Sequence, residues 1–234
     1  MHLDSIGPVA ADSTRRLLVC RVAGAFYAID ASVVVQIQEV DQLAKCPHSG
    51  EVRGMARVRG RSVPVVDARK RMGLPSREEE LRELNLALDS FEAHHQSSPC
   101  SDAHHCGLSR WLGEPIFSPA IQRLMERMEE AHRVLREHGA AAPDKPLTSA
   151  GRAWSRLRML KTRIQKATRE ARELLVCART SNVLSALTVD FVEGIHDLPL
   201  IERQPSGPHF VNELREMDSK SVFVVDLKWL LTPS

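Results

Sequence analysis

Histidine and cysteine side chains, the residues in this chain best suited to hold a metal ion, gather in one part of the sequence. Six of the ten histidines lie between positions 94 and 138, together with two of the five cysteines. Imidazole nitrogen and thiolate sulfur are the ligands that Zn²⁺ prefers, and a closed site takes four of them in a tetrahedron. We therefore expect zinc ligands from Cys106, His132, His95 and either His105 or its neighbour His104.

Apolar residues in this region recur at helical spacing, which predicts the helices that would position these ligands. One apolar stripe begins after Ser76 and ends at His95, and a second follows the helix start Ser118–Pro119 and carries His132. A third stripe begins near Ser149. Both histidines then face the interior of an antiparallel helical bundle. The alternative is a metal-free bundle whose core-facing histidines are hydrogen-bonded.

A duplication surrounds the predicted bundle. Leu17–Cys20 recurs as Leu174–Cys177 after 157 residues, and Ser62–Arg69 is echoed by Ser221–Lys228 after 159 residues. Both copies contain short β-rich runs broken by turn residues, a pattern typical of small barrels. The sequence predicts an α+β fold in which a helical insert interrupts the β domain, with boundaries at 14–75, 76–172 and 173–234.

Composition and charge exclude several classes of function. The chain has a net charge of +2 and ten aromatic residues, so we expect no stacking groove for nucleic acid. It lacks an apolar run long enough for membrane insertion and a secretory signal, which favours a cytoplasmic protein. No phosphate-binding loop or hydrolase motif indicates an enzyme. Residues 148–172 carry eight bases and one acid, which leaves open an anionic-surface-binding helix.

Three stretches of the β-rich halves resemble the CheW-like domain, an adaptor module of bacterial chemotaxis: Phe26–Ile37, Gly54–Asp67 and Val222–Leu231. The resemblance implies a fold of two intertwined five-stranded β-barrels and a non-catalytic role. It also implies three partners, namely a CheA-type histidine kinase, the cytoplasmic tip of a chemoreceptor, and other CheW-like domains.

The matched positions of this resemblance suggest an interface formed by Arg59, Gly60, Val34 and Ile37. The chain departs from the family pattern twice, because Arg57 stands in place of the usual Asn and Gln36 in place of a common Glu. An alternative interpretation of Arg59–Gly60 is a plain hairpin turn with an exposed arginine.

The stretch Asp102–Leu112 resembles the chemoreceptor zinc-binding (CZB) domain, whose signature cysteine and tryptophan match Cys106 and Trp111. The resemblance implies zinc as a cofactor and an insert that senses zinc or oxidants. Arg136 stands where the family has its next histidine, so Glu129 or His95 would have to complete a rearranged site. The alternative is a metal-free module that binds another protein or an anionic surface.

Overall fold

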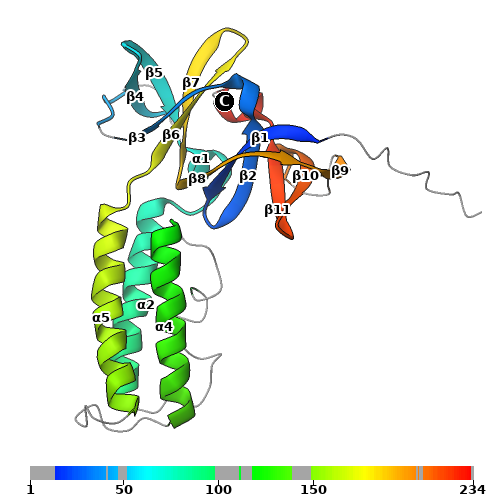
Figure 1. The fold of residues 1–234 in the computed structure, drawn as a ribbon. Coiled ribbons are helices and arrows are strands. Elements are labelled where there is room, and N and C mark those ends of the chain that lie inside the picture. The colour runs from blue at the N-terminus through cyan, green and yellow to red at the C-terminus, as the bar shows by residue number, and fades with distance from the viewer. Residues whose placement is uncertain are drawn as a thin grey trace, which may run out of the picture. The chain divides into compact units, whose positions relative to one another are not determined.

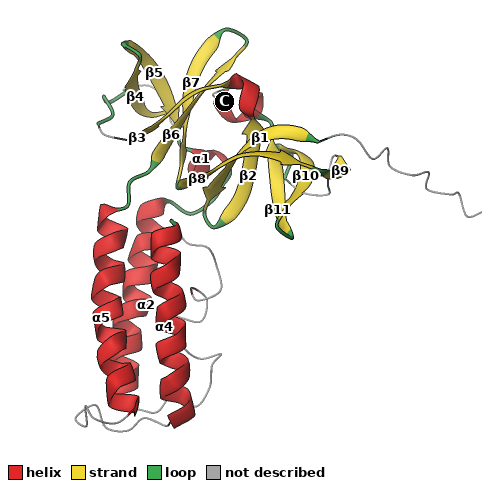
Figure 2. Ribbon diagram, in the orientation of Figure 1, coloured by secondary structure: helices red, strands yellow, loops and turns green. Residues whose placement is uncertain are grey.

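The structure of the protein is a computed structural model that describes residues 14–40, 42–46, 52–97, 111, 118–138, 149–203, 205 and 208–232. The chain divides into two compact units, shown as ribbons in Figure 1 and by secondary structure in Figure 2. The β unit consists of Met1–Arg21, Ala25–Met72 and Leu174–Ser234. The helical unit consists of Gly73–Glu173 and the short turn Val22–Gly24.

The β unit contains the strands and several short helical segments. They are β1 (Arg15–Val22), β2 (Ala25–Asp30), the 3-10 helix η1 (Ala31–Val33), β3 (Val34–Glu39), β4 (Val52–Val58), β5 (Arg61–Val66), α1 (Ala68–Arg71), β6 (Leu174–Thr180), β7 (Val183–Val189), β8 (Phe191–Leu198), β9 (Leu200–Arg203), β10 (Val211–Met217), β11 (Lys220–Val225) and α6 (Leu227–Leu231).

The two copies of the duplication are interleaved in two sheets. The six-stranded sheet has the order β8-β1-β2-β11-β10-β9, and the five-stranded sheet has the order β3-β6-β7-β5-β4. Each sheet therefore takes two adjacent strands from one copy (β1 and β2, or β6 and β7) and the others from the second copy. The joins between copies include two parallel pairs, β2 with β11 and β5 with β7.

The prediction of two closed five-stranded barrels is wrong. One sheet has six strands, and β3 and β4 are opposite edges of the other. In the described part of the chain, the segment after β3 meets β4 only at the isolated bridge between Ala44 and Met55. At that point a Cβ atom on Gly54 would lie 2.7 Å from the carbonyl oxygen of Ala44. A glycine therefore permits one close approach, but no continuous ladder between described residues joins these two edges.

Each sheet of the β unit has its own buried cluster. Alternate side chains of a strand point to opposite faces, and the apolar ones turn inward. The cluster of the six-stranded sheet comprises Leu17, Val19, Phe26, Ala28, Leu198, Val222 and Val224. The cluster of the five-stranded sheet comprises Ala56, Val58, Val63, Val65, Leu175, Cys177 and Ala186.

The helical unit contains α2 (Arg77–Ser97), α4 (Pro119–His138) and α5 (Ser149–Glu170), which confirms the three predicted helices. A reciprocal cap begins α2, because the N–H of Glu79 donates to Ser76 Oγ (3.2 Å) and the N–H of Ser76 donates to Glu79 Oε2 (2.9 Å). At α4, the N–H of Ile121 donates to Ser118 Oγ (3.4 Å), which agrees with the predicted N-cap.

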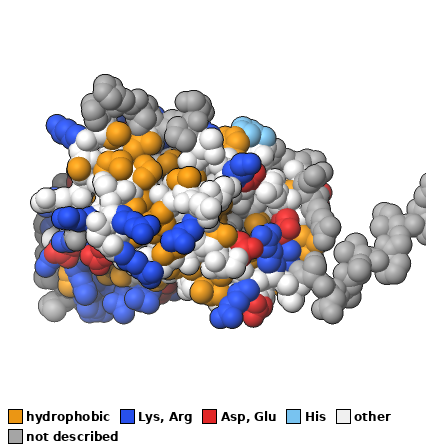
Figure 3. Space-filling model, turned by 90° about the horizontal axis from the view of Figure 1, so that it is seen from above, with side chains coloured by type: hydrophobic (Ala, Val, Ile, Leu, Met, Phe, Trp, Pro, Cys, Tyr) orange, Lys and Arg blue, Asp and Glu red, His pale blue; other side chains and the backbone are white. Residues whose placement is uncertain are grey.

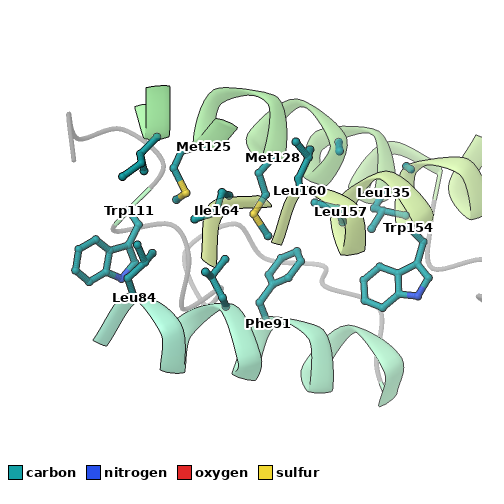
Figure 4. Packing of buried hydrophobic residues seen from close by; sticks show 14 residues of the cluster. Leu84, Phe91, Trp111, Met125, Met128, Leu135, Trp154, Leu157, Leu160 and Ile164 are labelled. Atoms are coloured by element: carbon teal, nitrogen blue, oxygen red, sulfur yellow. The ribbon is translucent and has the colours of Figure 1, made fainter. Parts of the chain in front are cut away.

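The helices of this unit meet on their apolar faces. Lys161 Nζ of α5 lies 2.7 Å from the Asp89 carboxylate of α2, while Arg77 Nη2 donates to the carbonyl of Ala171 at 2.6 Å. The helix α5 therefore runs antiparallel to α2, and Figure 4 shows α4 running in the same direction as α2. The core consists of Leu84, Leu88, Phe91, Trp111, Ile121, Met125, Met128, Ala131, Leu135, Ala153, Trp154, Leu157, Leu160 and Ile164.

Candidate functional site

The predicted interface residues Arg59 and Gly60 form the turn between β4 and β5. Their backbone φ angles are +47° and +78°, values that match the two-residue turn favoured in antiparallel hairpins. Glycine adopts this conformation without cost, whereas arginine does so uncommonly. Both residues are exposed. The hairpin geometry of the alternative interpretation is therefore present, but the arginine makes further contacts.

The side chain of Arg59 is held against the opposite edge of the sheet. Its Nη2 donates to the carbonyl of Val35 at 3.1 Å, and its Nε donates to Gln36 Oε1 at 3.3 Å. Two residues along β3, Gln38 Nε2 donates to the carbonyl of Arg57 at 3.3 Å. Side chains thus connect two edges that the backbone ladder leaves apart.

The glutamine pair explains how the arginine is positioned. Gln36 Nε2 donates to Gln38 Oε1 at 2.7 Å, which leaves Gln36 Oε1 to accept from Arg59. In the sequence, Gln36 was noted only as a departure from the pattern of the CheW-like domain. No role was predicted for Gln38. The alternation of two glutamines along one strand was the available signal, since residues i and i+2 share a face.

The other predicted interface residues, Val34 and Ile37, lie on the strand that Arg59 contacts. Val34 is half-buried, and Ile37 is 41% exposed, one of the exposed large hydrophobic side chains of the described chain. The structure therefore brings all four predicted residues to β3 and the tip of the neighbouring hairpin. An exposed apolar side chain and a fixed guanidinium are both groups that protein interfaces favour.

The start of β3 is fixed by the carboxylate of Asp30. It caps η1 by accepting from the N–H of Ser32 (2.9 Å) and from Ser32 Oγ (2.6 Å), and Arg15 Nη2 donates to it at 2.6 Å. The Ser32 hydroxyl and then Arg15 lower the pKa of Asp30 to about 2. The carboxylate is therefore ionised at neutral pH, the form that this network requires.

Most of the predicted zinc site falls outside the described residues. Cys106 and His105 are not described, and of His95 only the helical backbone is described. His132 is buried (3% exposed), and its ring meets the ring of Phe91 edge-on at 5.1 Å between centroids. Within the described residues, no group of three or more His, Cys, Asp or Glu side chains could hold a metal. The zinc site stays a prediction.

One comparison with known proteins supports the resemblance of the first β-rich half. Residues 16–90 match the family model of the CheW-like domain. Among solved structures, the chain is similar to the scaffolding protein TtCheW from Thermoanaerobacter tengcongensis, with a TM-score of 0.47 and 13% identity over 92% of this chain and 90% of that one. No curated protein matches.

These comparisons do not extend to every prediction. They give no support to the resemblance between the helical insert and the chemoreceptor zinc-binding domain. The family match ends at residue 90, so the second β-rich half is assigned to the same fold unit by its pairing with the first. Among the described helices, none is both long and apolar enough to cross a membrane.

Proposed function

We propose that this protein is a non-catalytic adaptor that couples a CheA-type histidine kinase to chemoreceptors. The match of residues 16–90 to the CheW-like domain supports the general role. The observation that carries the proposal is the anchoring of Arg59 on β3, the strand that also carries the exposed Ile37. Arginine and apolar anchors dominate the energetics of many protein interfaces.

The anchoring of Arg59 matters for affinity because a held side chain has already lost much of its rotamer freedom. Binding normally costs about 0.5–1.5 kcal/mol for each long side chain that it immobilises. The bonds to Val35 and Gln36 supply that order before a partner arrives. We therefore place the contact with the kinase or the receptor on β3 and the Arg59–Gly60 turn.

The Arg59→Glu variant should lose recruitment into a complex with a cognate CheA-type kinase and a receptor cytoplasmic fragment. Reversing the charge of a residue at an energetic centre removes about 2 kcal/mol or more, a fall of about 30-fold in affinity. Co-sedimentation of the full chain measures it. The control is Lys220→Glu, an exposed position in the matching turn region of the other sheet. Equal recruitment of the two variants would contradict the proposal. A wild-type chain that is not recruited into the complex would contradict it as well.

We further propose, from the sequence pattern, that the helical unit supplies a zinc or oxidant input. A structural zinc would stabilise the fold of this unit and hold Cys106 as a thiolate, the form that oxidants attack. His132 supports this idea, because it is a buried imidazole within an otherwise apolar core.

Metal analysis of the purified full chain tests the zinc proposal. We expect about one Zn²⁺ per chain and a clear loss of metal in the Cys106→Ser variant. The half-buried Cys46 lies outside the helical unit, and its replacement by serine is the matched control that should retain the metal. If the wild type and both variants are all purified without metal, the zinc proposal is rejected. The alternative, a metal-free interaction module, then remains.

A further inference from the structure

A hollow of about 420 Å³ lies at one end of the five-stranded sheet, apart from the contacts of Arg59. It is lined by Arg61, Ser62, Val63, Arg179, Asn182 and Leu184. These residues come from the start of β5, the end of β6, and the turn and start of β7. Its size falls in the range of ordinary ligand-binding clefts.

The strand register explains why this hollow has an apolar floor and a charged rim. Arg179 is two residues beyond the buried Cys177, and Arg61 is two residues before the buried Val63. Side chains at this spacing share a face of the sheet, so both arginines continue the rows that form the core. Arg179 is also the ladder partner of Leu184. At this end of the sheet, the rows of buried core side chains are therefore followed by two arginine side chains.

The charge around this hollow is one-sided. The β4–β5 hairpin (Val52–Val66) and the β6–β7 hairpin (Leu174–Val189) together carry five arginines and no acidic residue. Among the described residues, neither Arg61 nor Arg179 forms a salt bridge. Figure 3 shows Lys and Arg side chains among exposed hydrophobic ones on the face seen from above, where Asp and Glu side chains are also visible.

The duplication provides an internal comparison for this charge. At the offset of 159 residues, the positions of Arg57, Arg59 and Arg61 correspond to Glu216, Asp218 and Lys220 in the β10–β11 hairpin. The matching hairpin of the six-stranded sheet is therefore mixed in charge, although its backbone turns in the same way at Asp218 and Ser219, with φ of +50° and +62°. The basic character belongs to one sheet and is not required by the turn.

We propose that this hollow binds acidic side chains of a partner protein. Two arginines that form no salt bridge with any described residue favour carboxylates, which a guanidinium can bind through two parallel hydrogen bonds. Ser62 and Asn182 add polar groups at the rim, and Val63 and Leu184 accept the methylene groups of a glutamate or an apolar neighbour. The proposal does not depend on the adaptor role, because it rests on other residues.

A peptide-binding experiment on the full chain tests this proposal. The probe is a short fluorescein-labelled peptide in which glutamate alternates with leucine, and its control contains glutamine in place of glutamate. Fluorescence polarisation should show binding of the glutamate peptide only, and added salt should weaken that binding. The Arg61→Glu and Arg179→Glu variants should each lose about tenfold or more in affinity.

The matched control is Lys220→Glu, at the position in the duplicate hairpin that corresponds to Arg61. It should bind the peptide as the wild type does. Arg61 and Arg179 are both exposed, so their replacement should not disturb the fold, and circular dichroism checks that each variant is folded. The variants Arg61→Gln and Arg179→Gln remove the charge without reversing it. Equal binding of the glutamine peptide, or an equal loss in Lys220→Glu, would overturn the proposal. A single-stranded DNA oligonucleotide that binds more tightly than the peptide, with the same loss in both arginine variants, would overturn it in favour of phosphate binding.

Discussion

Replacing Asp190 with alanine should lower the free energy of unfolding of the β unit by about 3–5 kcal/mol, because it leaves a buried guanidinium without its counterion. Asp190 Oδ2 lies 2.6 Å from Arg69 Nη2, and the side chains are only 2% and 4% exposed. The cost of removing one partner of such a pair is dominated by the desolvated charge that remains. An exposed ion pair contributes far less.

The position of this ion pair makes it important for the interleaved fold. Arg69 belongs to α1, which follows β5 of the first copy, whereas Asp190 follows β7 of the second copy. Nearby, the N–H of Ala68 donates to Thr188 Oγ1 at 3.2 Å, and the N–H of Asp190 donates to the carbonyl of Arg21 at 2.9 Å. The pair therefore connects the halves of the duplication where the parallel β5–β7 ladder ends.

Hydrogen exchange across a urea titration, followed on peptides from β5 and β7, measures the stability of the β unit. Arg133→Ala is the control, since it removes ion pairs of the helical unit whose side chains are about half exposed (50–51%), and it should leave the exchange of the β5 and β7 peptides unchanged. The double variant Arg69→Met/Asp190→Leu should recover much of the loss, because it removes both charges. A change below about 1 kcal/mol in Asp190→Ala would refute the argument.

Helices and most strands of this chain were predictable because their signals are local. Apolar spacing places the three long helices, and the caps Ser76 and Ser118 mark the starts of two of them. The duplication was visible as two matches at nearly equal offsets. By contrast, Met159 and Leu160 could not be distinguished from spacing alone; Leu160 is buried, and Met159 is 53% exposed.

Three strands (β4, β9 and β10) escaped the sequence analysis, and β4 and β10 did so for identifiable reasons. β4 contains Gly54, a residue type that is depleted in strands, but the glycine is needed where Ala44 approaches the strand. β10 alternates charged residues, and one of them, Arg215, is buried: its Nη1 donates to the carbonyl of Leu198 at 2.7 Å and its Nη2 to Glu213 at 2.7 Å. A hydropathy pattern counts every arginine as an exposed polar residue. It therefore cannot reveal a strand whose arginine is buried and hydrogen-bonded.

The candidate interface was predicted in its residues but not in its contacts. Arg59, Gly60, Val34 and Ile37 were taken from a family resemblance, and the structure does bring them to one region. The bond from Arg59 to the carbonyl of Val35 depends on how two edges of one sheet approach each other. That geometry is set by long-range parallel pairing between copies, which no local pattern specifies.

In the helical unit, the Leu88→Ala variant should lose about 2–5 kcal/mol of stability, whereas the Leu86→Ala variant should change it by less than about 0.5 kcal/mol. Both leucines lie on α2, but Leu88 is fully buried and Leu86 is 58% exposed. Removing the buried side chain sacrifices its transfer free energy and leaves a cavity among neighbours from α4 and α5. The same substitution at the exposed site leaves no cavity.

The two substitutions share residue type, helix and intrinsic propensity, so their difference isolates burial. Helix propensity is nearly equal for leucine and alanine, which removes the backbone as an explanation. Trp111 and Trp154 both lie in this core, and the remaining tryptophan, Trp229, belongs to α6 of the β unit. Fluorescence in a Trp229→Phe background therefore follows the helical unit during urea unfolding. Equal midpoints for the two variants would show that the helices do not meet through the face that Figure 4 shows, and the placement of His132 in that core would then fail with it.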